Sequence, residues 1–153
     1  MYQRILVAVN HETYHEAVSE ALKLVEHPGV RIRIVHVIDV PVNASEGVNL
    51  EGIYRAREDE GRRLLDDAMA LARAARVEPE SALIDGMGRR IGELLREEVA
   101  TWHADLLVMG AKRRSPLARI FSDNVCDAIV GRTPVAVLLG GVLAAQHAAA
   151  AAG

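Results

Sequence analysis

The sequence has few aromatic residues and a single cysteine. Phe, Trp and Tyr make up 3% of the 153 residues, so aliphatic and alanine side chains must form the core. Hydrophobic residues make up 50% of the chain, which is enough for one sizeable core, and the length suits a single domain. Because Cys126 is the only cysteine, an intrachain disulfide is excluded.

Long apolar runs and a strong charge of either sign are also missing. No stretch reaches the roughly 18 apolar residues that a membrane helix requires. The short apolar run near the N-terminus is not followed by a small-residue cleavage site. The formal net charge of −3 provides no global attraction to nucleic acid or to an anionic membrane. We therefore expect a cytoplasmic protein with no nucleic-acid partner and no membrane partner.

Short apolar runs alternate with helical patterns along the chain. The runs are continuous and rich in β-branched residues, which is typical of strands buried on both faces of a parallel sheet. Strands are predicted over Arg4–Val9, Val30–Val40, Ser81–Gly86, Asp105–Gly110 and Thr133–Gly141. Helices are predicted from about Thr13, Glu51, Arg89 and Ser122. Strict alternation predicts an α/β domain with helices on both faces of a parallel sheet.

This pattern occupies residues 1–140, which we interpret as one domain. Residues 141–153 form a low-complexity, alanine-rich tail. The connection from Pro41 to Leu50 is long for a link between a strand and a helix, so we expect it to have a functional role.

The first helix begins in a polar segment with two histidines. Thr13 and Glu16 have the spacing of a capping box, which predicts that the Thr13 side chain caps this helix. His11 and His15 are four residues apart, a spacing that can place two metal ligands on one helix face. No third ligand is placed by a recognisable motif, so we favour a capping or solvent-facing role and predict no metal site.

Four of the apolar runs resemble those of the universal stress protein family. The resemblance is carried by "ILVAV" near the N-terminus, "HVI" at the end of the second strand, "ADLLVMG" and "TPVAVLL", and it extends from Arg4 to about Leu139. It implies a flavodoxin-like or Rossmann-like open sheet of five parallel strands in the order 3-2-1-4-5. It also implies a homodimer that forms through the last strands.

Open α/β sheets bind ligands beyond the carboxyl ends of their strands, where the strand order reverses. In the implied order, this point lies between the first and fourth strands, which end at Asn10 and Gly110. We therefore predict a ligand pocket between these two residues. The resemblance adds Met109 and Gly110 as nucleoside contacts, and Val37 as part of an adenine pocket.

The ATP-binding branch of this family has a glycine motif that is only partly present here. The motif is glycine, two residues, glycine, nine residues, and then glycine with serine or threonine. The motif positions are occupied in this chain by Gly110, Arg113, Asp123 and Asn124. The family usually has an acidic residue at the end of the first strand, and this chain has Asn10 there. Glycines and a helix N-terminus let backbone N–H groups approach phosphate. Arg113 obstructs that approach, and Asp123 repels phosphate.

We therefore expect that the site does not bind ATP in the family's usual way. The alternative is a sensor of ATP, AMP or a related nucleotide, and no cofactor is certain. The basic residue Lys112 and the segment around Val125 belong to the same candidate pocket. Arg113 is itself ambiguous, because its charge can also bind phosphate.

Other reactive residue types have simpler interpretations. His36 lies in an apolar strand and is interpreted as a packed, hydrogen-bonded histidine. Cys126 is interpreted as a buried, inert thiol. Glu97 and Glu98 are adjacent on a helix, so their side chains diverge and do not form a catalytic pair. No arrangement of a nucleophile and a base is recognisable, and we predict no catalytic residue.

The last predicted strand is apolar on both faces. Because an open apolar edge strand promotes aggregation, we expect it to pair with its counterpart in a symmetric dimer. The alternative is that the alanine-rich tail covers it. The expected interface residues are Val135, Ala136, Val137, Leu138 and Leu139.

These observations predict a dimeric regulatory protein of the stress response that binds an unknown protein partner and catalyses no reaction. The basic turn after Gly110 and the loop from Pro41 to Leu50 would form its responsive surface. A nucleotide sensor is the second hypothesis. An ATP hydrolase is the third and weakest, since neither a base nor a metal ligand is evident.

Overall fold

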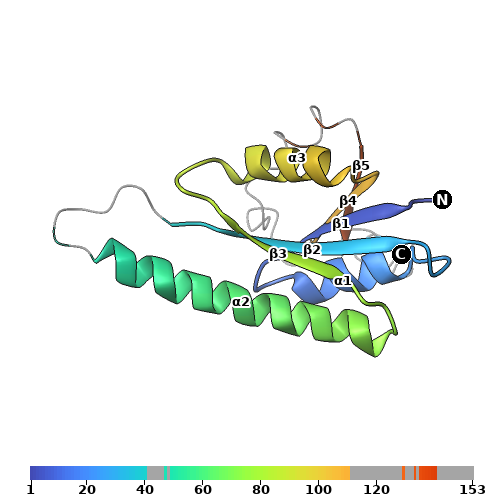
Figure 1. Ribbon diagram of the computed structural model, residues 1–153, viewed down its shortest axis with the longest axis horizontal. Coiled ribbons are helices and arrows are strands. Elements are labelled where there is room, and N and C mark those ends of the chain that lie inside the picture. Colours follow the sequence, from blue (N-terminus) through green and yellow to red (C-terminus); the bar gives the residue numbers. More distant parts are fainter. Residues whose placement is uncertain (41–46, 48, 111–128, 130–132, 134, 141–153) are drawn as a thin grey trace, which may run out of the picture.

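Five parallel strands form the centre of the computed structural model, and helices cover both faces of this sheet (Figure 1). The structure describes residues 1–40, 47, 49–110, 129, 133 and 135–140. Most of the loop from Pro41 to Leu50, most of the helix predicted from Ser122, and the tail lie outside these residues. The elements are β1 (Arg4–Ala8), α1 (Tyr14–Leu22), β2 (Arg31–Ile38), α2 (Leu50–Ala74), β3 (Glu80–Asp85), α3 (Ile91–Trp102), β4 (Leu106–Gly110) and β5 (Ala136–Gly140).

The strands lie in the order β3-β2-β1-β4-β5, and every neighbouring pair is parallel. This confirms the predicted α/β fold and the strand order that the family resemblance implied. The register pairs Ile5 with Ile32 on one side and with Leu106 on the other. β1 therefore lies at the centre of the sheet, and Ile5, Leu6 and Val7 are completely buried.

Alternate residues of the central strands face opposite layers of the molecule. Ile5 and Val7 point to the face covered by α1 and α2, where they pack with Val18, Leu64 and Ala68. Leu6 and Ala8 point to the face covered by α3, in a second apolar cluster that includes Leu95, Val99 and Trp102. Figure 1 shows this separation, with α3 on one side of the sheet and the other two helices on the opposite side.

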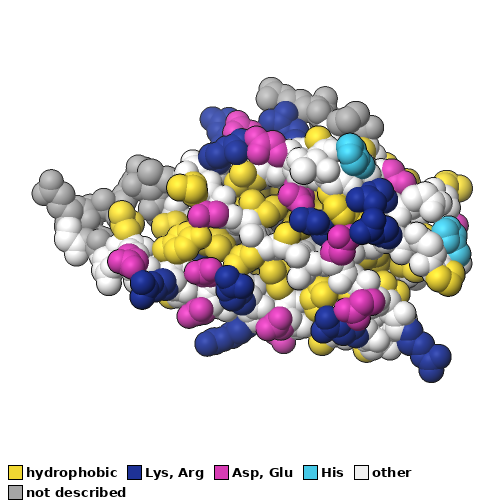
Figure 2. Space-filling model, viewed as in Figure 1, with side chains coloured by type: hydrophobic (Ala, Val, Ile, Leu, Met, Phe, Trp, Pro, Cys, Tyr) yellow, Lys and Arg dark blue, Asp and Glu magenta, His cyan; other side chains and the backbone are white. Residues whose placement is uncertain are grey.

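Helix α2 is the longest element, and its outer face carries charges of both signs (Figure 2). Arg62 pairs with Glu58 one turn earlier at 2.8 Å, and Arg55 pairs with Glu51 at 2.7 Å. Such exposed pairs contribute little to stability, but they keep this helix face polar. No helix in the described part of the chain is long and apolar enough to cross a membrane.

Candidate functional site

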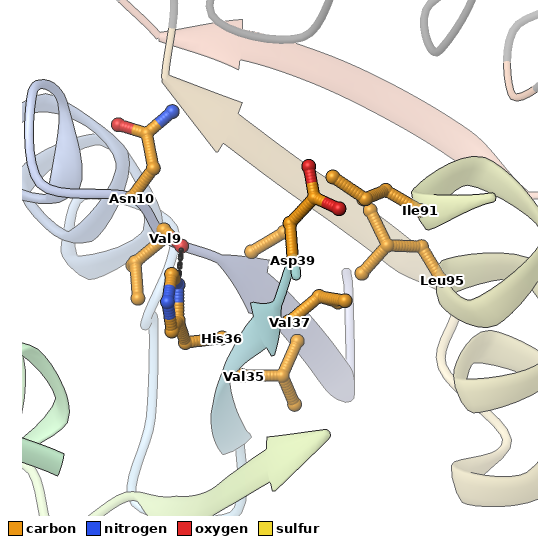
Figure 3. Close-up of a pocket in the computed structure, with 9 residues that line it drawn as sticks. Val9, Asn10, Val35, His36, Val37, Asp39, Ile91 and Leu95 are labelled. Carbon is orange, nitrogen blue, oxygen red and sulfur yellow. Dashed lines mark hydrogen bonds between the residues drawn. The ribbon is translucent and has the colours of Figure 1, made fainter. Parts of the chain in front are cut away.

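A hollow of about 150 Å³ lies at the carboxyl ends of β1 and β2 (Figure 3). It exists because the two strands end at different levels. β1 ends at Ala8, which pairs with Val35, whereas β2 continues to Ile38. The first turns of α3 form the opposite wall. The lining residues are Ala8, Val9, Asn10, Val35, His36, Val37, Asp39, Ile91 and Leu95.

The walls of the hollow are mainly aliphatic. Val35 and Val37 come from β2 on the face toward α3, and Ile91 and Leu95 come from adjacent turns of α3. Figure 3 shows these two pairs on either side of the space, with Asn10 and Asp39 at its polar end. An apolar slot with a few polar groups at one end is the usual form of a small-molecule site.

Asn10 closes the turn between β1 and α1. Its Oδ1 accepts hydrogen bonds from the Glu12 N–H at 3.0 Å, the Thr13 N–H at 3.0 Å and the Thr13 hydroxyl at 2.9 Å. The predicted capping box is therefore wrong. The helix does open directly after Thr13, as predicted, but the Thr13 side chain makes no capping bond, and its hydroxyl donates to Asn10 Oδ1 instead.

This turn determines what Asn10 offers to a ligand. With Oδ1 engaged, the amide nitrogen is the group that remains, and it is a hydrogen-bond donor. Figure 3 shows the nitrogen on the side of the hollow and the oxygen on the side of the turn. An aspartate here would present a second acceptor oxygen instead, so the asparagine changes the chemistry of the site.

Gly110 lies at the end of β4 against the same turn. A Cβ on Gly110 would lie 2.5 Å from the Thr13 Cβ and 2.6 Å from the Thr13 carbonyl oxygen. Thr13 is itself only 3% exposed, so it has no room to withdraw. The close packing of β4 against the start of α1 therefore requires glycine at this position, independently of any phosphate.

His36 connects the hollow to the α2 side of the sheet. Its Nδ1 lies 2.8 Å from the Val9 carbonyl oxygen. Because a carbonyl only accepts, Nδ1 carries the proton. This confirms the interpretation of His36 as a packed, hydrogen-bonded histidine. Burial lowers the pKa of His36; the bond to Val9 opposes this, and the nearby His11 adds to the lowering.

The shift in the pKa of His36 predicts a loss of stability at low pH. The unfolded chain has the ordinary histidine pKa of about 6.5 and binds more protons than the native state below that pH. The free energy of unfolding should therefore fall as pH is lowered through about 6.5. We expect His36→Asn to flatten this dependence in urea titrations, because asparagine can donate to Val9 but does not titrate in this range.

His103→Asn is the matched control for that measurement. His103 is exposed and has a left-handed backbone conformation, which asparagine tolerates. This variant should keep the pH dependence of the wild type. An unchanged slope in His36→Asn would show that protonation of His36 is not its source.

His11 and His15 do not share a helix face. Helix α1 begins at Tyr14, so His11 precedes it and instead contacts the His36 ring at 6.0 Å between centroids. The alternative of two ligands on one helix face is therefore excluded, and both histidines are exposed, as the favoured solvent-facing role predicts. Among the residues that the structure describes, no group of three His, Cys, Asp or Glu side chains is placed to hold a metal ion.

The structure brings together part of the predicted site. Asn10 and Val37 line the hollow. Met109 and Gly110 are buried at the end of β4 and are not among the described residues that line it. Lys112, Arg113, Asp123, Asn124 and Val125 lie outside the described residues, so the interpretation of the glycine motif stays a prediction.

Sequence reasoning missed Asp39, Ile91 and Leu95. Asp39 lies near the end of the predicted second strand, Val30–Val40, and directly follows the observed β2. The rule that ligands bind beyond the carboxyl ends of strands could have identified it. Ile91 and Leu95 fall in the helix predicted from about Arg89, and their spacing of four residues is that of a buried helical stripe. Only the tertiary packing of α3 over β2 shows that they also face a hollow.

The expected dimer residues lie on or beside the edge strand β5. Val135, Val137 and Leu139 pack toward the α3 face, Leu138 packs toward the α1 face, and Ala136 is exposed. Within the described residues, β5 pairs with β4 on one side only. The dimer interface itself stays a prediction.

The model of the universal stress protein family matches residues 1–139. The chain therefore belongs to the universal stress protein family. A family protein from Burkholderia pseudomallei is 25% identical with a TM-score of 0.72, over 90% of this chain and 95% of that one. No curated protein matched the chain.

Two more distant solved structures contain nucleotides. The universal stress protein from Archaeoglobus fulgidus in complex with dAMP is 19% identical, with a TM-score of 0.62 over 92% of this chain and 98% of that one. A family protein from Arabidopsis thaliana with AMP bound is 17% identical, with a TM-score of 0.60 over 93% of this chain and 94% of that one. At these identities, the likeness establishes the shared fold.

Proposed function

We propose that this protein is a non-catalytic regulatory protein of the stress response that binds an adenine nucleoside monophosphate. The base would occupy the hollow at the ends of β1 and β2. The observation that carries this proposal is an apolar slot between β2 and α3 whose lining includes the polar side chains of Asn10, His36 and Asp39. Family proteins of the same fold that contain AMP and dAMP support it.

The size of the hollow fits a base better than a whole nucleotide. Its volume is about 150 Å³. An apolar protein cavity of about 150 Å³ can hold a benzene molecule, which is comparable to part of a nucleobase. The ribose and phosphate would then lie outside the hollow, toward the ends of the strands.

We expect the site to bind a nucleoside monophosphate more tightly than ATP, because this chain departs from the family's glycine motif at residues 113 and 123. The sequence predicts that Asp123 lies near a helix start, where it would repel a triphosphate, and that Arg113 would obstruct the approach of the backbone to phosphate. A like charge at about 4 Å costs on the order of 1–4 kcal/mol. That cost corresponds to roughly one to three decades of affinity.

A regulatory role requires that ligand binding change the surface of the protein in a way that a partner protein can recognise. We propose that the protein is a homodimer through β5, and that ligand binding alters the surface formed by the basic turn and by the loop from Pro41 to Leu50. The apolar residues of β5 support the dimer. The position of Asp39 just before that loop supports a link between ligand and loop.

Thermal unfolding in the presence of AMP or ATP tests the proposal. At ten times its Kd, AMP should stabilise the protein by about 1.4 kcal/mol, or roughly 3–6 °C. ATP should bind at least about tenfold more weakly. The combined variant Arg113→Gly and Asp123→Gly should reduce this difference. The absence of any saturable shift with AMP would refute nucleotide binding.

A variant that fills the hollow locates the binding. Ile91→Trp places an indole at its wall and should abolish the shift caused by AMP. Ile53→Trp is the matched control, because Ile53 is also a half-buried isoleucine in the first turn of a helix but does not line the hollow. If AMP still stabilises Ile91→Trp as much as Ile53→Trp, then AMP binds elsewhere.

A further inference from the structure

A groove of about 480 Å³ lies at the amino ends of the strands, at the opposite end of the sheet from the hollow. Helices α1 and α2 both end there, as Figure 1 shows. Its floor is aliphatic: Leu22 and Val25 come from the end of α1, Val30 directly precedes β2, and Val77 lies between α2 and β3. Val30 is buried, and the other three are half-buried against the core. The volume of the groove is typical of a small-molecule site.

The charges around this groove are almost completely paired. Two carboxylates line it, and each has a cationic partner: Glu26 pairs with the N-terminal amine at 3.0 Å, and Glu78 pairs with Arg73 at 2.9 Å. The His27 Nδ1 accepts a backbone N–H at 3.1 Å, so that ring is neutral. Of the charged side chains that line the groove in the described part of the chain, this leaves the Arg76 guanidinium without a partner.

The backbone at Arg76 is in the left-handed region, with a φ of 61°. This residue directly follows the end of α2, where its N–H donates to the Arg73 carbonyl at 2.9 Å and the Val77 N–H donates to the Ala72 carbonyl at 3.0 Å. In this type of helix end the left-handed position is usually glycine, because a Cβ is costly there. Arginine therefore carries a strain that glycine would avoid, and strain of this kind is typical of functional positions.

We propose that this groove binds an aliphatic carboxylate, with the hydrocarbon chain along the valines and the carboxylate at Arg76. The planar guanidinium of arginine matches a carboxylate in both charge and geometry. The aliphatic floor favours a hydrocarbon body, because each CH₂ group that leaves water contributes to binding. A medium-chain fatty acid has both parts. This site differs from the hollow in its position and in its ligand, so the proposal does not rest on nucleotide binding.

Calorimetric titration of decanoate, decylammonium and hexanoate into the protein tests both parts of the ligand. Decylammonium has the same chain with the opposite charge, so it should bind at least about tenfold more weakly than decanoate. Hexanoate has the same charge and four fewer CH₂ groups, and it should also bind at least about tenfold more weakly. Equal affinities for decanoate and decylammonium, or no saturable heat with decanoate, would overturn the proposal.

Arg76→Gly separates ligand binding from folding. Glycine tolerates the left-handed backbone, so the variant without ligand should unfold at or above the wild-type temperature. Its Kd for decanoate should nevertheless rise at least about tenfold. Arg63→Gln is the matched control, because Arg63 is an exposed arginine of α2 that does not line the groove, and it should keep the wild-type Kd. If Arg76→Gly unfolds at a lower temperature and still binds decanoate as the wild type does, Arg76 only stabilises the end of α2, and the proposal fails.

Discussion

Replacing Gly110 with alanine should lower the free energy of unfolding by about 3 kcal/mol, near the upper end of what overpacking costs. The added Cβ would lie 2.5–2.6 Å from three atoms of Thr13, one of them the backbone carbonyl oxygen. Thr13 can move only if its hydroxyl loses the 2.9 Å bond to Asn10. Urea unfolding followed by circular dichroism measures this loss.

Gly140→Ala is the matched control, because Gly140 also ends a strand of the same sheet. There an added Cβ would lie 3.0 Å from the Glu20 Cγ, in a side chain that can rotate away, and 3.2 Å from the Glu16 carbonyl oxygen, which is farther than any of the three Thr13 atoms at Gly110. We expect less than half the loss seen at Gly110. Equal stability of Gly110→Ala and the wild type would mean that the contact between β4 and α1 is looser than described, and that Gly110 serves another purpose.

Replacing Trp102 with alanine should have a still larger effect, about 4 kcal/mol, because truncating a buried tryptophan typically costs 3–5 kcal/mol. Trp102 is 6% exposed and packs in the apolar cluster beneath α3. The Arg4 guanidinium lies 4.4 Å from the centre of its ring. Since this is the only tryptophan, unfolding should be followed by far-ultraviolet circular dichroism rather than by fluorescence.

Trp102→Phe separates packing from hydrogen bonding at this position. Phenylalanine keeps much of the apolar area but loses the indole N–H, which donates to Glu80 at 3.2 Å. We expect a loss of about 1–2 kcal/mol from the lost hydrogen bond and the smaller ring, since Glu80 still accepts a bond from Arg31. If Trp102→Ala lost no more than Trp102→Phe, the contribution of the ring to the core would be refuted.

The strands were predictable because their signal is local. The run Arg4–Val9 predicted β1, which ends at Ala8, and Ser81–Gly86 predicted β3, which spans Glu80–Asp85. Burial on both faces gives such runs a continuous apolar pattern that does not depend on neighbours far away in the sequence. The order of the strands was not local, and it came from the family resemblance.

Helix α1 begins where the sequence predicted, directly after Thr13, but without the side-chain bond that a capping box implies. Thr13 and Glu16 fit a capping box, but Asn10 lies three residues before Thr13 and reaches the N–H groups of Glu12 and Thr13. Asparagine and threonine both make such local bonds, and the spacing alone does not decide between them. The geometry of the turn that leaves β1 decides in favour of Asn10.

The candidate site was only partly predictable because it forms between elements. Asn10 follows from a strand end, which the sequence places well, and Val37 came from the family resemblance. Ile91 and Leu95 belong to a helix that crosses over β2, and nothing in their spacing separates a core contact from the wall of a hollow. Gly110 was interpreted as a phosphate-binding glycine, whereas its closest contact is the side chain and backbone of Thr13.

The most direct measurement is an NMR titration in which AMP is added to the nitrogen-15-labelled protein. The chemical shifts of the backbone amides report which residues respond. The largest changes should fall on Val9, Asn10, Val37 and Asp39, because these residues surround the hollow at the ends of β1 and β2. A second groove, between the ends of α1 and α2, includes Val25 and Val77. Changes concentrated there, or no saturable change at all, would contradict a base-binding site at the strand ends.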